Sequence, residues 1–169
     1  MYLAAVARSN SVSVISDEFT NTDACILLGE LWNHGHMADN IFGGVHHIAI
    51  ICSDYEKSKR FYVDVLKSEI VTEIYREERK SFKLNLRLVD GVEIELFSFP
   101  ESPARPSYPE ACGLRHLALK VGDFVAAINW MTSNNVFVED VRVDELTGAR
   151  FTFLADPDGL PIELYEHLV

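Results

Sequence analysis

Basic residues are scarce in this sequence, and no long apolar run is present. The chain has 15 Lys and Arg against 26 Asp and Glu, a formal net charge of −11 at pH 7 with neutral histidines. Nucleic-acid backbones and anionic membrane surfaces bind clustered Lys and Arg, so this balance argues against both as partners. No apolar stretch approaches the roughly 20 residues that a membrane helix requires.

Cysteine is also scarce, and its spacing follows no known pattern. Cys25, Cys52 and Cys112 match neither a zinc knuckle nor a redox pair, and three is an odd number. They are interpreted as free thiols in a reducing compartment. The N-terminus lacks a basic segment followed by an apolar stretch, so no signal peptide is predicted. These absences favour a cytoplasmic protein.

The composition suits one folded domain preceded by an extension. Apolar residues make up 48% of the 169 residues, enough for a sizeable core. Residues 1–7 are apolar, residues 9–23 are rich in Ser, Thr, Asn and Asp, and residues 24–32 suit a short amphipathic helix. We predict that residues 1–44 form a flexible or accessory extension. Residues 45–169 are expected to form the domain itself.

From residue 45 the pattern predicts a strand, a helix and three more strands. Strands are expected at 45–52, 70–75, 82–89 and 92–99. Asp54 is a plausible cap for a helix at 55–66, and Asp90-Gly91 is a hairpin turn signal. Residues 100–113 are expected to connect this first module (45–99) to the next, because 100–109 holds four of the six prolines.

The same order then repeats in a second module at 114–167. Strands are predicted at 114–121, 136–143, 150–154 and 160–167. Asp123 caps a predicted helix at 124–134, and Asp156-Pro-Asp-Gly159 forms the turn before the last strand. The fold class is therefore predicted as α+β, with two paired βαβββ modules that form curved mixed sheets around a site.

Individual residues repeat as well as the element order. His47 and His116 are 69 positions apart (116 − 47), and Glu95 and Glu163 are 68 apart (163 − 95). Three further pairs share the 69-residue offset: Asp54 and Asp123, Tyr55 and Phe124, Phe61 and Trp130. Each module thus keeps a His in its first strand and a Glu in its last, which indicates one site built from two related halves.

These four side chains suit a divalent metal. Two imidazoles and two carboxylates bind Zn²⁺, Ni²⁺, Co²⁺, Mn²⁺ or Fe²⁺ better than a soft metal. His46 and Glu93 are the alternatives to His47 and Glu95. His46 would point to the opposite strand face, whereas Glu93 shares the face of Glu95 and is more typical of a solvated position. The repeat selects His47, Glu95, His116 and Glu163 as ligands.

The motifs that carry the repeat resemble a known family. They are Val45-His-His-Ile-Ala-Ile, Ile94-Glu-Leu-Phe, Arg115-His-Leu-Ala-Leu and Asp156-Pro-Asp-Gly-Leu-Pro-Ile-Glu-Leu-Tyr-Glu166. This set resembles the vicinal oxygen chelate superfamily, which has the glyoxalase/bleomycin resistance/dioxygenase fold, and in particular the bacterial glyoxalase I-like proteins. The resemblance implies a homodimer whose metal site is completed within one chain or across the dimer.

The resemblance also implies an activity. A lactoylglutathione lyase uses its metal to hold two vicinal oxygens of a hemithioacetal formed from a 2-oxoaldehyde and glutathione. A carboxylate removes a proton, and the metal stabilises the enediolate. By resemblance the base is Glu163, with Glu95 second. The alternatives are an epimerase that acts beside a thioester carbonyl and a small-molecule binding protein of the same fold.

The sequence departs from the glutathione-using relatives at two places. It has Ile48-Ala-Ile-Ile51 where they carry an Arg, and Leu96-Phe-Ser-Phe99 where they carry an Asn. Both polar contacts to glutathione are therefore missing, which leaves the cosubstrate open between glutathione and another thiol, and Phe97 and Phe99 would suit a more apolar or smaller substrate. Cationic side chains that suit an anionic substrate group are Arg76, Arg79 and Lys83, which are equally typical of solvated charges.

Overall fold

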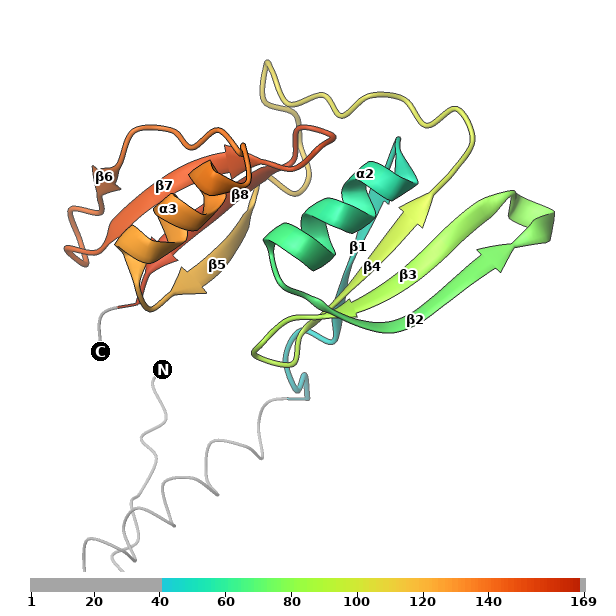
Figure 1. Ribbon diagram of the computed structural model, residues 1–169, viewed down its shortest axis with the longest axis horizontal. Coiled ribbons are helices and arrows are strands. Elements are labelled where there is room, and N and C mark those ends of the chain that lie inside the picture. The colour runs from blue at the N-terminus through green and yellow to red at the C-terminus, as the bar shows by residue number, and fades with distance from the viewer. Residues whose placement is uncertain (1–40, 168–169) are drawn as a thin grey trace, which may run out of the picture. The chain divides into compact units, whose positions relative to one another are not determined.

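The structure is a computed structural model that describes residues 41–167. Most of the predicted extension, including the helix expected at 24–32, lies outside the described residues. The described chain forms two four-stranded mixed sheets in succession, each accompanied by a helix (Figure 1). The predicted α+β architecture is thereby confirmed. None of the helices between residues 41 and 167 has the length and apolar character needed to cross a membrane.

The first sheet has the strand order β1-β4-β3-β2. Its strands are β1 (His47–Cys52), β2 (Glu69–Arg76), β3 (Ser81–Arg87) and β4 (Glu93–Ser98). β1 runs parallel to β4, while β3 is antiparallel to both of its neighbours. All four predicted strands are confirmed, with ends that differ by no more than about two residues, the usual uncertainty of element boundaries.

The β3-β4 hairpin closes at the predicted Asp90-Gly91 turn. Gly91 has φ +88°, a conformation that a residue without Cβ adopts at little cost. Its N–H donates to the Leu88 carbonyl, and the Leu88 N–H donates to the Val92 carbonyl, each at 2.9 Å. Counting outward from the Leu88–Val92 pair gives the register, which places Asn85 opposite Glu95.

The first helix starts where its cap predicts. Asp54 accepts a hydrogen bond from the Lys57 N–H at 3.0 Å, which satisfies one of the free donors at the start of α2 (Tyr55–Arg60). The chain continues as a π-helical turn, η1 (Phe61–Val65). The helix predicted at 55–66 is therefore confirmed, with a wider second half. A short 3₁₀ turn, η2 (Glu77–Arg79), joins β2 to β3.

The second sheet repeats the first, with the order β5-β8-β7-β6. Its strands are β5 (Leu117–Val121), β6 (Arg142–Val143), β7 (Arg150–Ala155) and β8 (Pro161–Glu166). β5 is parallel to β8, and the other pairs are antiparallel. Asp123 accepts from the Ala126 N–H at 2.9 Å and so caps α3 (Phe124–Ser133), as predicted.

The strand predicted at 136–143 is wrong over most of its length. Only Arg142–Val143 pairs with β7. The Val136 N–H donates back to the Met131 carbonyl at the end of α3, and the Glu139 N–H makes a single bond to the Phe153 carbonyl. A strand needs a continuous ladder of such bonds. The apolar alternation here reflects packing instead, because Val136 and Val138 lie against the core.

Each sheet has one buried and one open face. The helices α2 and α3 contact β4 and β8 respectively, and the buried side chains lie on those faces. Ile94 and Leu96 of β4 are fully buried, as is Ile162 of β8. Because side chains alternate along a strand, Glu95 and Glu163 project from the opposite, open faces.

The turn at 156–159 joins the two modules. The Tyr62 hydroxyl donates to the Asp156 carboxylate at 2.9 Å. The Ser53 N–H donates to Asp158 at 3.1 Å, and the Ser58 hydroxyl donates to the same carboxylate at 3.3 Å. The sequence predicts this segment only as a turn. In the structure its two carboxylates also accept hydrogen bonds from residues of the first module.

Candidate metal-binding site

The first predicted pair, His47 and Glu95, lies on the open face of the first sheet. His47 begins β1, and Glu95 lies in the neighbouring parallel strand β4. The two side chains converge, with His47 Nε2 at 3.7 Å from Glu95 Oε2. The imidazole side chain is 41% exposed and the carboxylate 14%, so an incoming ion can reach both from the solvent side.

His46 supports His47 and does not replace it. The Nδ1 atoms of the two rings are 2.9 Å apart, a hydrogen-bond distance, and the rings meet edge to face. Histidines that bind metals usually hydrogen-bond through the second ring nitrogen, which fixes the ring orientation. With Nδ1 engaged by His46, the Nε2 atom of His47 is the nitrogen that faces Glu95.

Glu95 is held by two donors from β3. Lys83 Nζ lies 2.6 Å from Glu95 Oε1, and Asn85 Nδ2 donates to the same oxygen at 3.2 Å. The Lys83 ammonium lowers the pKa of Glu95 from its usual value, with a smaller contribution from Asn85. The second oxygen, Oε2, remains directed toward His47.

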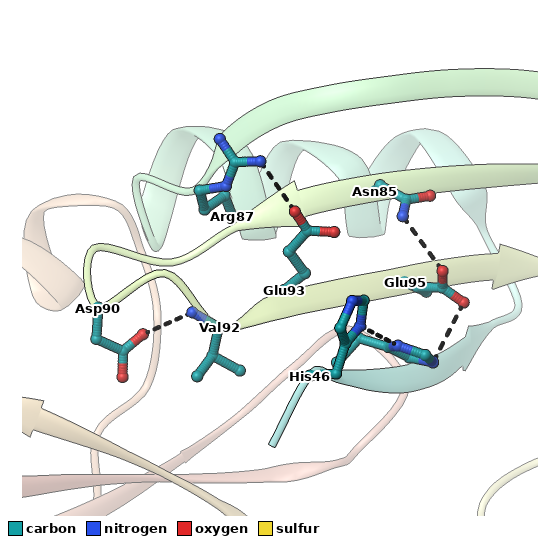
Figure 2. Close-up of polar contacts among 8 residues, drawn as sticks. His46, Asn85, Arg87, Asp90, Val92, Glu93 and Glu95 are labelled. Carbon is teal, nitrogen blue, oxygen red and sulfur yellow. Dashed lines mark hydrogen bonds and ion pairs between the residues drawn. The ribbon is translucent and has the colours of Figure 1, made fainter. Parts of the chain in front are cut away.

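The rival carboxylate, Glu93, has a different partner. It shares the face of Glu95, as expected, but its Oε1 accepts from Arg87 at 3.0 Å (Figure 2). This bond also lowers the pKa of Glu93. Glu93 is therefore engaged in an ion pair with Arg87, and the choice of Glu95 as the metal ligand stays a prediction.

The second predicted pair, His116 and Glu163, repeats this arrangement in the second sheet. His116 immediately precedes β5, and Glu163 lies in β8. His116 Nε2 is 3.1 Å from Glu163 Oε2. The imidazole packs edge-on against the ring of Phe153, with centroids 5.3 Å apart. Its Nδ1 atom is buried and has no hydrogen-bond partner among the described residues, so packing orients this ring.

The structure thus brings the four predicted ligands together as two pairs. Donors that bind one ion at about 2.1 Å, at angles of roughly 90–110°, lie about 3.0–3.4 Å apart. The His116–Glu163 pair falls in this range, and the His47–Glu95 pair is slightly wider. Within residues 41–167 no group of three or more His, Cys, Asp or Glu lies close enough to hold a metal. A single four-ligand site stays a prediction.

A pocket of about 570 Å³ lies beside His116. This volume is in the usual range for small-molecule sites. Its walls combine apolar rings with guanidinium groups, including Tyr108, Phe137, Phe153, Arg105, Arg115 and Arg142. Arg142 is paired with Glu139 at 3.0 Å and lies over the Phe153 ring. The pocket therefore offers both apolar and charged contacts next to a predicted ligand.

The expected cationic anchors have other partners in the structure. Lys83 is bound to Glu95, as described above. Arg76 lies over the rings of Phe97 and Phe99, at 4.8 and 5.4 Å from their centroids, and donates to the Ser81 hydroxyl. Arg79 lies in η2 and is exposed. A role for these cations in binding a substrate anion stays a prediction.

The two described cysteines are free, as predicted. Cys112 is exposed. Cys52 is buried, and this burial raises the pKa of its thiol to about 11, with Asp158 adding to the effect. A thiol with so high a pKa is almost wholly protonated at neutral pH and is a poor nucleophile. Cys25 lies outside the described residues.

Asn85 is a neighbour of Glu95 that reasoning from the sequence missed, and the contacts of Lys83 with Glu95 and of His46 with His47 were not predicted either. A two-residue turn at Asp90-Gly91 would pair Asn85 with Leu96. The structure closes the hairpin at Leu88 and Val92, and this register pairs Asn85 with Glu95.

Comparison with known proteins agrees with this fold. The family model described as "Glyoxalase/Bleomycin resistance protein/Dioxygenase superfamily" matches residues 44–164. The chain therefore belongs to this superfamily, a class whose members are built from paired βαβββ modules.

Two relatives in bacteria are similar over the same region. The uncharacterized protein YwkD of Bacillus subtilis is 57% identical over 122 residues, and YaeR of Escherichia coli is 58% identical over 122 residues. Each match covers 72% of this chain and 95% of the relative. A glyoxalase family protein from Enterococcus faecalis has a solved structure with a TM-score of 0.70 at 46% identity, covering 75% of this chain and all of that one.

A more distant relative carries a named activity. Metallothiol transferase FosB of Staphylococcus saprophyticus is 27% identical over 126 residues, covering 72% of this chain and 75% of that protein. The superfamily thus includes metalloenzymes alongside the closely similar uncharacterized proteins.

Proposed function

We propose that this protein is a metal-dependent lyase or isomerase of the glyoxalase I type, and that His47, Glu95, His116 and Glu163 bind one divalent ion. The observation that carries the proposal is the repeated geometry. In both sheets an imidazole Nε2 faces a carboxylate Oε2 from the last strand of the module, at 3.7 and 3.1 Å. Zn²⁺, Ni²⁺, Co²⁺, Mn²⁺ and Fe²⁺ all accept this donor set.

The proposed site is shared between two copies of the chain. Each pair supplies two donors, whereas these ions take four or more ligands. No third donor joins either pair within residues 41–167. We infer a homodimer in which His47 and Glu95 of one protomer meet His116 and Glu163 of the partner subunit. A twofold dimer then has two equivalent sites, because each protomer offers both halves.

The proposed reaction moves one proton between neighbouring carbons of the substrate. A bound divalent ion supplies positive charge near two adjacent substrate oxygens. Glu163 is assigned as the base that takes the proton from one carbon and returns it to the next, so the substrate is isomerised without net oxidation. His116 and the pocket of about 570 Å³ border the place where the substrate would bind. A thiol adduct of a 2-oxoaldehyde fits this chemistry.

The test uses the purified full-length chain. Metal content is measured after loading with Zn²⁺, Ni²⁺, Co²⁺ or Mn²⁺, and methylglyoxal turnover is then followed with glutathione and with smaller thiols. Reaction in D₂O reports proton transfer as deuterium in the product. Lack of divalent metal binding rejects the proposed site. Metal binding without turnover by any thiol rejects the glyoxalase activity and keeps the metal site.

A second candidate is thiol transfer, favoured by the similarity to metallothiol transferase FosB. In such a reaction a C–S bond forms while the bond from that carbon to an oxygen breaks, and the oxygen takes up the thiol proton, so no carbon-bound proton moves. The test replaces methylglyoxal with an epoxide and follows loss of the thiol in D₂O. Thiol loss without deuterium on carbon supports thiol transfer, and no thiol loss beyond the metal-free control rejects it.

A further inference from the structure

The two predicted metal ligands of carboxylate type differ in their surroundings. Glu95 Oε1 receives Lys83 Nζ at 2.6 Å and Asn85 Nδ2 at 3.2 Å, both from the adjacent strand β3. Its Oε2 faces His47. One carboxylate oxygen is thus restrained by protein donors, and the other is available to an ion.

The equivalent positions of the second sheet are aromatic. The register pairs Lys83 with Phe97 in the first sheet and Phe151 with Tyr165 in the second. It likewise pairs Asn85 with Glu95 and Phe153 with Glu163. Where the first sheet has an ammonium and an amide, the second has two phenyl rings.

Glu163 consequently has fewer restraints. Among the described residues, His116 is the one group recorded in an ion pair or hydrogen bond with it. Phe153 lies opposite Glu163 in the neighbouring strand, and its ring contacts His116. Its side chain has no N–H or O–H group that could donate to the carboxylate. The two half-sites match in their histidine and glutamate but not in what holds the glutamate.

We infer that Lys83 and Asn85 are positioning residues that fix Glu95 as a permanent metal ligand and leave Glu163 as the mobile carboxylate. The inference rests on the proposed function. Charge-assisted hydrogen bonds restrain a carboxylate more strongly than neutral ones, and such supporting contacts commonly decide metal affinity. A base must leave the ion to move a proton, and of the two carboxylates only Glu163 has no donor on its second oxygen among residues 41–167.

The charge of Lys83 has a further consequence. Two carboxylates balance a divalent ion, so the ammonium leaves the surroundings of the site with a positive charge. A positive environment favours negative charge on substrate oxygens. Lys83 therefore acts on the site through Glu95 and through its charge, without needing to contact the substrate.

The test uses Co²⁺ as the probe, because its visible absorption reports ligand geometry. Lys83→Met removes the ammonium and keeps most of the side-chain length. We expect about tenfold weaker Co²⁺ binding and an altered absorption band, in line with the loss caused by removing a supporting partner. Lys83→Arg, which can still donate to Glu95, should restore most of the affinity and the band.

A matched control comes from the same module. Lys59 pairs with Glu73 at 2.6 Å, and its side chain is 25% exposed against 31% for Lys83. Lys59→Met removes the same charge without touching Glu95 and should leave Co²⁺ binding unchanged. Thermal unfolding of each variant shows that it is folded, and Asn85→Ala should give a smaller loss if Lys83→Met does not fold.

The outcomes separate the inference from the proposed function. Absence of Co²⁺ binding by the wild-type chain overturns the proposed metal site itself. Wild-type binding together with unchanged or tighter binding by Lys83→Met overturns the positioning role alone. An equal loss with Lys59→Met would show a general charge effect, which also overturns it.

Discussion

His116 Nε2 faces Glu163 Oε2 at 3.1 Å, and Phe153 packs against the imidazole from the neighbouring strand. The pair is therefore oriented by an aromatic ring where the corresponding pair in the first sheet is oriented by hydrogen bonds. Among residues 41–167, His116 is the one group that pairs with Glu163, and the role of base proposed for this carboxylate leads to the first prediction.

Glu163→Gln should reduce turnover more than it reduces metal affinity. The amide can still offer an oxygen to the ion but cannot accept the substrate proton. We expect a loss in kcat of about 100-fold or more, the scale of general base catalysis, with a smaller change in Zn²⁺ affinity. Competition with a chromophoric chelator measures the affinity. Equal losses in both quantities would indicate that Glu163 is a ligand alone.

Mixed dimers test whether the site is shared. His47→Ala and His116→Ala should each abolish metal binding, because each damages both sites of a homodimer. After unfolding and refolding a 1:1 mixture, half of the dimers contain one of each chain and have one undamaged site. We expect about one quarter of the wild-type metal sites to return. No recovery, with mixed dimers demonstrated by mass spectrometry, would place the site within one chain.

Tyr62→Phe should lower the free energy of unfolding, because it removes a hydrogen bond between the two modules. Tyr62 is fully buried and its hydroxyl donates to Asp156, which is 6% exposed. Removing the donor leaves a buried carboxylate oxygen without that partner, which costs about 1–3 kcal/mol. Urea unfolding measures the change in the free energy of unfolding.

A surface tyrosine provides the control for that experiment. Tyr75 is 43% exposed, so Tyr75→Phe should change the free energy of unfolding by less than about 0.5 kcal/mol. A Tyr62→Phe loss no larger than that of Tyr75→Phe would show that the bond to Asp156 contributes little.

Stability in acid should depend on Glu166. The Arg150 guanidinium and backbone N–H lower the pKa of Glu166 to about 2 in the folded chain. A depressed carboxyl pKa adds stability above the unfolded value, near 4.3, and that stability is lost as the pH falls toward about 2. Glu166→Gln should therefore lose less stability than the wild type between about pH 5 and 2.

The measurement is the urea midpoint at several pH values across that window. Other carboxylates also titrate there, so the wild type and the variant are compared at each pH. Parallel curves for the two proteins would contradict the assignment of this acid dependence to the Arg150–Glu166 ion pair.

Local sequence was sufficient for most of the fold. Asp54 and Asp123 cap their helices, and Asp90-Gly91 closes its hairpin, because these features need only neighbouring backbone groups. The strand predicted at 136–143 forms only at Arg142–Val143, because strand formation depends on more than neighbouring residues. Its apolar alternation was real, but whether a strand forms depends on a continuous partner that local sequence does not reveal.

The sequence by itself determined the repeat, the two sheets and the choice of His47, Glu95, His116 and Glu163. Each of these follows from periodicity and from matched spacing between the modules. Only the tertiary structure decided that the four residues stand as two pairs, and that Lys83 and Asn85 hold one glutamate while Phe153 lies beside the other. The reason is that these contacts cross from strand to strand, where distance depends on register and twist and not on position along the chain.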